Sequence, residues 1–307
     1  MQVYKISREE KEAWCSIPRE ALPDHPDSKI RLILRDTRPE VAELVGNMMA
    51  DEVIANNAAG KITKWVLPSG PEDQYRTFIR RVNEERISLK NVYAFHMDEV
   101  LDWECRPYPV GDHPKSCRGR MLTRFYGRID PELNIPEDHR FWPCVEDLDF
   151  TDRKCEELGG IDTAWIGVGY KGLVAANESP ESVYLNISVE DYANSKTRIT
   201  MKNPDSTVLR SERVYGGMYD RVDPFMVTIG MKILLSAKRA VAMVTTGKMK
   251  QTVIRVAMFS EPTLEYPITL FPKYVPEVIF CCDKLSADHP LSHEVIELSN
   301  ENMGGAG

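Results

Sequence analysis

Residues 159–178 read GGIDTAWIGVGYKGLVAANE, and the prediction of the fold starts from this stretch. Residues 161–168 form a mostly apolar run that is long enough for a buried strand. Gly167, Gly169 and Gly172 lie at and after its end, where they allow a sharp turn and a close approach to a bound group. In open parallel sheets small ligands bind beyond the carboxyl ends of the strands. Because glycine-rich strand ends also occur as plain tight turns, this stretch alone leaves both interpretations open.

Strands and helices alternate along most of the chain. Strands are predicted at residues 29–34, 61–67, 91–95, 141–143, 161–168, 225–229, 240–244 and 278–281. Helices are predicted at residues 41–55, 75–82, 115–126, 146–158, 231–238 and 248–259. Residues 181–210 alternate polar and apolar side chains, which indicates an antiparallel ribbon or a loop. The alternation predicts an α/β fold with a single doubly wound, mostly parallel, Rossmann-like sheet that has helices on both faces.

The 307 residues suit one large domain, which we place at residues 29–299. Residues 1–28 are polar and contain three prolines, so we expect an N-terminal extension outside the core, with one short helix. Residues 300–307 are expected to be a disordered tail.

Composition narrows the possible partners and location. The chain has 39 Lys and Arg against 47 Asp and Glu, a net charge of −8, which argues against general affinity for nucleic acid or an anionic membrane. No stretch has the length and apolar character of a signal peptide or a membrane span, so we expect a soluble, cytoplasmic protein. The 7 cysteines form no CxxC pair and have no spacing that suits zinc, so no metal site and no cofactor is predicted.

Three predicted strands end in unusual loops, PSG at residues 68–70, MDE at 97–99 and GYKG at 169–172. If the strands are parallel, all three loops reach the same edge of the sheet. They can then surround one ligand, and this convergence is the best evidence for a site.

Several motifs match one known family in the same order along the chain. FHMDE at residues 95–99 is similar to a family motif FNMDE, and HPKS at 113–116 to HPxS. Residues 159–178 are similar to the family's catalytic segment, and Arg213 and Lys250 fall where the family places an Arg and a Lys on a sugar phosphate. Over residues 29–285 the chain thus resembles the glucosamine-6-phosphate deaminase/isomerase family, within the wider group that includes 6-phosphogluconolactonases.

The chain departs from this family at two places. Where the family has Asp-Gly-His, the chain has Lys171-Gly172-Leu173, so the ring-opening histidine and its carboxylate partner are missing. The phosphate loop, Gly-Ser-Thr-Pro or similar in the family, is shorter here and is followed by Glu72 and Asp73, whose charges oppose an anion. The resemblance therefore implies a sugar-phosphate enzyme with an altered substrate.

Three residues are the candidate catalytic groups. Aldose–ketose interconversion needs a base that moves a proton between neighbouring carbons, and the family match assigns this role to Asp98; the alternative is a carboxylate that caps a helix or turn. Glu178 resembles the family's ring-opening acid, but without the histidine it would orient a sugar hydroxyl or remain a solvated loop carboxylate. His96 would share the face of Asp98 if the strand continues and would take over part of the proton transfer; the alternative is a hydrogen-bonded structural histidine.

The candidate substrate-binding residues come from the loops and from two distant cations. The resemblance places Ser69, Gly70, Gly169 and Gly172 at the substrate.

Lys171 would pair with Asp98 or Glu178, hold an acidic substrate, or act as an amine nucleophile if its pKa were lowered. Arg213 and Lys250 would bind a phosphate or carboxylate through charge-assisted hydrogen bonds, although each taken alone would more often be a surface cation.

The function expected from the sequence is isomerisation or deamination of a phosphorylated or otherwise acidic sugar through an enediol-type intermediate. One alternative is a non-catalytic sugar-phosphate-binding or regulatory protein that has lost the chemistry. A weaker alternative is a hydrolase similar to 6-phosphogluconolactonase. The expected partner is a small sugar phosphate or acidic sugar. The resemblance is compatible with a homo-oligomer, but no surface in the sequence requires one.

Overall fold

The computed structural model describes residues 4–70, 72–111, 115–180 and 185–293. Its central sheet has seven strands in the order β1-β10-β9-β6-β2-β3-β5, and all neighbouring pairs are parallel. The strands are β1 (Arg31–Arg35), β2 (Thr63–Leu67), β3 (Val92–His96), β5 (Arg140–Phe141), β6 (Thr163–Ile166), β9 (Arg239–Val244) and β10 (Glu277–Asp283). The predicted α/β fold with a mostly parallel sheet is confirmed.

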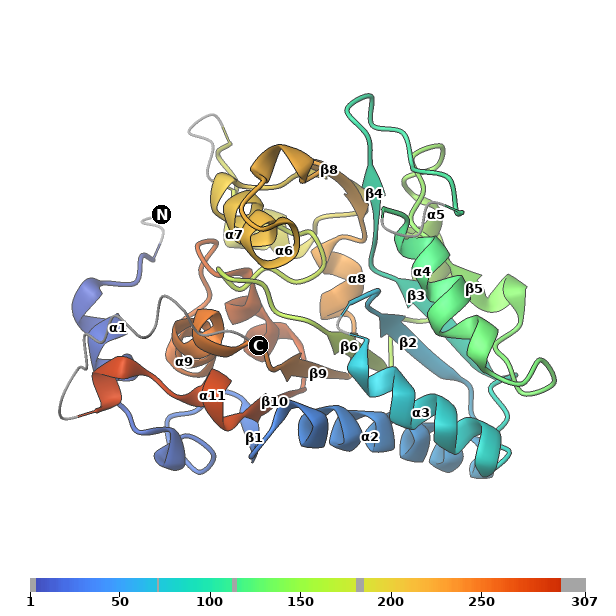
Figure 1. Cartoon of the computed structure of the whole chain (residues 1–307), viewed down its shortest axis with the longest axis horizontal. Helices are drawn as coiled ribbons and strands as arrows, with labels where there is room; N and C mark the ends of the chain where they lie inside the picture. The colour runs from blue at the N-terminus through green and yellow to red at the C-terminus, as the bar shows by residue number, and fades with distance from the viewer. Residues whose placement is uncertain (1–3, 71, 112–114, 181–184, 294–307) are drawn as a thin grey trace.

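Successive residues of each strand enter different cores because side chains alternate across a sheet. In β2, Val66 belongs to one core, whereas Trp65 and Leu67 belong to the other. One face is covered by α2 (Arg38–Ala58), α3 (Asp73–Glu84) and α4 (Cys117–Arg124). The opposite face is covered by α5 (Phe150–Glu157), α8 (Met231–Leu235) and α9 (Gln251–Phe259) (Figure 1). Burial on both faces explains the nearly continuous apolar runs.

A second sheet, which we did not predict, stands beside the carboxyl ends of the main strands. It is antiparallel, in the order β4-β8-β7, and consists of β4 (Asp98–Leu101), β8 (Phe225–Thr228) and β7 (Arg198–Met201). We expected residues 225–229 in the main sheet, but they pair here instead. The antiparallel ribbon or loop expected in residues 181–210 is a strand only at β7, since residues 189–193 and 204–210 are helical, and residues 181–184 lie outside the described residues. Figure 1 shows α7 (Pro204–Tyr215) and α6 (Val189–Ala193) near this sheet.

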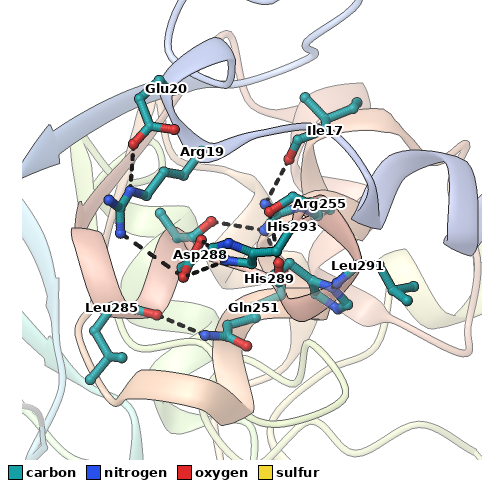
Figure 2. Close-up of polar contacts among 12 residues, drawn as sticks. Ile17, Arg19, Glu20, Gln251, Arg255, Leu285, Asp288, His289, Leu291 and His293 are labelled. Atoms are coloured by element: carbon teal, nitrogen blue, oxygen red, sulfur yellow. Dashed lines mark hydrogen bonds and ion pairs between the residues drawn. The ribbon is translucent and has the colours of Figure 1, made fainter. Parts of the chain in front are cut away.

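The N-terminal segment contributes to the core, contrary to our expectation. Leu22 is fully buried in the main core, and Cys15, at the end of α1 (Arg8–Cys15), is buried as well. The guanidinium of the fully buried Arg255 in α9 donates a hydrogen bond to the carbonyl of Ile17 at 2.9 Å (Figure 2). It also donates one to the carbonyl of Ala287 at 2.9 Å. Arg255 therefore joins the segment before β1 to α11 (Lys284–Ala287). A further short helix, α10 (Phe271–Tyr274), precedes β10. Residues 300–307 lie outside the described residues.

Candidate active site

The chain reverses its direction of travel across the sheet between β2 and β6. From β2 it continues to β3 and β5 on one side, and from β6 to β9 and β10 on the other. Such a reversal opens a crevice at the carboxyl ends of the two strands. A cavity of about 420 Å³ lies there, lined by the residues that follow β2, β3, β6 and β9. Its volume is in the range of small-molecule sites.

Seven of the ten site residues predicted from the sequence line this one cavity: Ser69, Gly70, Asp98, Gly169, Glu178, Arg213 and Lys250. Separate elements supply them, namely the loops after β2 and β6, strand β4, helix α7 and the short 3-10 helix Gly247–Lys250. The lining does not include the other three, His96, Lys171 and Gly172. The parallel strands therefore bring the three loops together, as expected.

His96 lies away from the cavity, which corrects its predicted role in proton transfer. Strand β3 ends at His96, and Met97 separates it from β4, so the alternation that would align His96 with Asp98 is interrupted. The imidazole is buried, its Nε2 is 2.8 Å from Tyr126 Oη, and its ring stacks on Trp142 with centroids 3.5 Å apart. Burial holds the pKa of His96 well below its usual value, with the charge of Arg140 adding to the effect. His96 is a neutral, packed histidine.

Lys171 pairs with neither of the carboxylates considered above. Its Nζ lies 3.2 Å from Oδ2 of Asp205, in the first turn of α7. This ion pair joins the loop after β6 to α7. Gly172 has a φ of 72°, and a Cβ at this position would lie 2.7 Å from Cγ2 of Ile268, so both conformation and space require glycine.

Leu173 lines the cavity where the resemblance implies a histidine. It packs closely on the loop, since a Cβ added to Gly169 would lie 2.4 Å from Leu173 Cγ. An isobutyl group can neither donate nor accept a proton. This position therefore has no side chain that could carry out the ring opening that the resemblance implies.

Asp98 opens β4 and is only partly exposed. Cys117 Sγ lies 3.8 Å from its Oδ1. Burial raises the pKa of Asp98 to about 6, the positive charge of Arg120 opposes this rise, the charge of Glu99 adds to it, and that of Lys202 opposes it. Asp98 is thus ionised at neutral pH and close to the pKa that suits a general base.

The neighbouring acid, Glu99, has a structural role. Its carboxylate accepts hydrogen bonds from the backbone N–H of Cys117 at 2.6 Å, the backbone N–H of Arg118 at 2.8 Å and Ser116 Oγ at 3.2 Å. These donors belong to the N-terminus of α4, where a negative charge is stabilising. Glu99 thereby places α4 beside Asp98.

Glu178 lies in the same cavity, and its Oε2 accepts a hydrogen bond from Ser206 Oγ at 3.0 Å. Burial raises the pKa of Glu178 to about 7, while the hydrogen bond from Ser206 opposes the rise and the charge of Asp205 adds to it. Near neutral pH this carboxyl group therefore exists in both protonation states.

Basic side chains dominate the lining, although the chain as a whole is acidic. The lining contains seven basic and three acidic side chains, an excess of four positive charges. One group consists of Arg38, Arg210, Arg213 and Lys250, and the other of Lys115, Arg120 and Lys202. Sequence reasoning identified only two of the seven. The others come from segments with no recognisable motif, and only the folded chain shows that they converge.

Lys250 is the most deeply buried of these cations, with 5% of its surface exposed. Its Nζ donates a hydrogen bond to the carbonyl of Val168 in the loop after β6. Burial, together with the nearby charge of Arg213, lowers the pKa of Lys250 to about 7. Burial and the charges of Arg210 and Arg38 likewise lower the pKa of Arg213. Like charges that lower one another's pKa are stabilised when an anion binds between them.

The two acids that counted against an anion in the loop after β2 are both neutralised. Glu72 pairs with Arg124 at 2.9 Å, and Asp73 pairs with Arg38 at 2.5 Å. Ser69 and Gly70 line the cavity, and the two acids that follow them in the loop are both held in ion pairs.

Among the described residues, no group of three or more His, Cys, Asp or Glu side chains could hold a metal ion. Within the same ranges, no helix has both the length and the apolar character needed to cross a membrane. His113 and Pro114 of the HPKS motif lie outside the described residues.

The chain is similar in sequence to several proteins that are named glucosamine-6-phosphate deaminase. A glucosamine-6-phosphate deaminase from Parabacteroides distasonis is 27% identical over 269 residues, which covers 84% of this chain and 91% of the relative. The glucosamine-6-phosphate deaminase of Caenorhabditis elegans is 28% identical over 225 residues, covering 70% and 76%. No family model matches the chain.

Several solved structures share the fold. A monomeric glucosamine-6-phosphate deaminase aligns with a TM-score of 0.67 at 21% identity and covers 84% of this chain and 99% of that protein. The 6-phosphogluconolactonase from Trypanosoma cruzi aligns with a TM-score of 0.61 at 17% identity, covering 86% and 98%.

Proposed function

This chain belongs to the superfamily of glucosamine-6-phosphate deaminases and 6-phosphogluconolactonases, and from that premise we propose that it is an isomerase or deaminase of a phosphorylated sugar, with Asp98 as the catalytic base. The observation that carries the proposal is the location of Asp98. A carboxylate with a pKa of about 6 lies in a cavity whose lining has an excess of positive charge. A base acts on a substrate that is held beside it, and the cations of the lining would hold an anionic one.

In the proposed reaction Asp98 removes the proton from C2 of an open-chain aldose phosphate. The electron pair of that C–H bond forms a C1–C2 double bond, and the carbonyl oxygen takes up a proton from water to become a hydroxyl of the enediol. The hydroxyl of C2 then gives a proton back to water as its oxygen becomes the new carbonyl. Return of the proton to C1 gives the ketose. If C2 carries an amino group, the same transfer gives an imine, which water hydrolyses to the ketose and ammonia.

The phosphate would be held by Arg213 and Lys250, which form no ion pair with a carboxylate in the described part of the chain. Glu178 would orient a hydroxyl group of the sugar, because no histidine accompanies it at the position of Leu173. Loss of the ring-opening group favours substrates that are already open-chain. The cytoplasm is the expected compartment for such metabolism.

A binding protein without chemistry is the second candidate, and the apolar Leu173 in the cavity is the observation that favours it. Both candidates predict that sugar phosphates stabilise the fold, by an amount that grows with ligand concentration. Only the enzyme exchanges a carbon-bound proton with solvent.

The deciding experiment is NMR of aldose phosphates and acidic sugars incubated with the protein in D2O. We expect loss of the C2 proton signal, or formation of ketose or ammonia, and a rate lower by about 10²- to 10⁴-fold in Asp98→Asn. Undiminished exchange in Asp98→Asn contradicts the assignment of the base. Thermal stabilisation without exchange or product across the panel establishes the binding protein instead, and hydrolysis of sugar-phosphate lactones alone would establish the lactonase.

A further inference from the structure

The cations of the cavity exceed what one phosphate requires. The group around Arg213 and Lys250 already offers several charges to a phosphate at the ends of β6 and β9. Arg120 and Lys202 are different, because their charges act on Asp98 and they come from two separate elements, α4 and the segment after β7. The proposed function leaves these two cations without a role.

Arg120 has little of its charge neutralised within the protein. Its Nη2 lies 3.1 Å from Cys117 Sγ and 3.4 Å from Ser69 Oγ, and its Nε is buried without a hydrogen-bond partner. In the described ranges no carboxylate lies within ion-pair distance of it. Arg124, one turn later on the same helix, does form an ion pair, at 2.9 Å from Glu72. The comparison indicates that Arg120 is kept available for a group that enters the cavity.

Lys202 shows the same feature. Its Nζ donates to the backbone carbonyl of Asp223 at 2.6 Å, and no ion pair with a carboxylate is formed within the part of the chain that the structure describes. Asp98 and Glu99 are the neighbouring negative charges, but the carboxylate of Glu99 is bound to the N-terminus of α4, and within the described residues neither acid forms an ion pair with Arg120 or Lys202. Both cations therefore keep donors for an anionic group that enters the cavity.

We propose that Arg120 and Lys202 bind a second anionic group of the substrate on the side of the cavity where Asp98 acts, so that the substrate is a sugar phosphate with a further acid group. This inference rests on the proposed function, since it places the first anion on Arg213 and Lys250. A guanidinium binds a carboxylate or a phosphate through parallel N–H···O bonds, so both kinds of acid fit Arg120. A cavity of about 420 Å³ holds a six-carbon chain with both groups.

The test uses three open-chain ligands that do not react and that differ only at C1. Glucitol 6-phosphate has an alcohol there, gluconate 6-phosphate a carboxylate, and glucitol 1,6-bisphosphate a second phosphate. We expect calorimetry at neutral pH to show that at least one of the doubly anionic ligands binds about tenfold or more tightly than glucitol 6-phosphate. Preference for gluconate 6-phosphate identifies the acid as a carboxylate, and preference for the bisphosphate identifies it as a phosphate.

The variant Arg120→Met should lose this preference and leave the affinity for glucitol 6-phosphate nearly unchanged. Lys202→Met is a second, independent variant from another element, in case the first one disturbs α4. Arg118→Met is the matched control: it removes the same charge from the same helix, but Arg118 lies over the Trp142 ring, 5.4 Å from its centroid, and is not among the residues that line the cavity. The control should keep the preference.

Equal affinity of the native protein for all three ligands overturns the inference. An equal loss of affinity for all three ligands in Arg120→Met overturns it as well. These outcomes are independent of the exchange assay on Asp98→Asn. If exchange persists in that variant, the proposed base is wrong while the binding preference still stands.

Discussion

Replacing Asp98 by asparagine should inactivate the protein and at the same time stabilise its fold. Burial raises the pKa of Asp98 from 3.8 to about 6, so the folded state binds the proton more tightly than the unfolded state does. The stabilisation that this gives is complete below the unfolded pKa and is lost as the pH rises through the folded pKa. At pH 8 the ionised carboxylate therefore costs about 3 kcal/mol, at 1.4 kcal/mol for each pKa unit, and at pH 4.5 only about 1 kcal/mol.

Asparagine has the same shape and no charge, so the cost of burying an ionised carboxylate disappears in Asp98→Asn. We expect the free energy of unfolding, measured with urea, to exceed that of the native protein by about 2–3 kcal/mol at pH 8 and by about 1 kcal/mol at pH 4.5. The rate of C2 proton exchange in the native protein should fall about tenfold between pH 7 and pH 5, as the base becomes protonated.

Asp223→Asn is the matched control for this prediction. Asp223 also lines the cavity, but its carboxylate pairs with Lys115 at 3.2 Å and accepts a hydrogen bond from Tyr108 Oη at 2.6 Å. Its replacement should bring no gain in stability. The reasoning is refuted if Asp98→Asn is no more stable than the native protein at pH 8, or if the difference between the two proteins does not depend on pH.

Three further predictions concern other parts of the molecule. Because the pKa of Lys250 is lowered to about 7, anion binding near pH 7.5 should be accompanied by proton uptake. Calorimetry in buffers of different ionisation enthalpy should show less proton uptake for Lys250→Met than for the native protein. Equal uptake in both proteins excludes this lysine as the group that gains the proton. Lys171→Met breaks the ion pair with Asp205 and should raise KM a few-fold, while the free energy of unfolding changes by less than about 1 kcal/mol. An unchanged KM would show that α7 keeps its place without this ion pair. Arg255→Met leaves the partly buried carbonyl of Ile17 without its donor and should lower the free energy of unfolding by about 2 kcal/mol, with faster proteolysis near residue 17. Native-like resistance to proteolysis would show that other contacts hold the N-terminal segment.

The sequence was sufficient to predict the layers of the fold and the edge of the sheet at which ligands bind. Runs such as residues 161–168 are apolar because their strands are buried on both faces, and this pattern is local and readable. The start of α2 was also readable, since Thr37 accepts a hydrogen bond from the backbone N–H of Glu40 at 3.4 Å and Pro39 occupies the first turn.

Only the tertiary structure decided which polar groups share the cavity and which protonation states they have. Pairing of β4 with β8 in a separate sheet separates the direction of Asp98 from that of His96, and α7 carries the partner of Lys171. Arg120 and Lys202 look like ordinary surface cations in the sequence, because no local pattern records that α4 and the segment after β7 both lie near Asp98. Contacts between distant segments and the loss of water around them set these properties, and neither is a function of neighbouring residues.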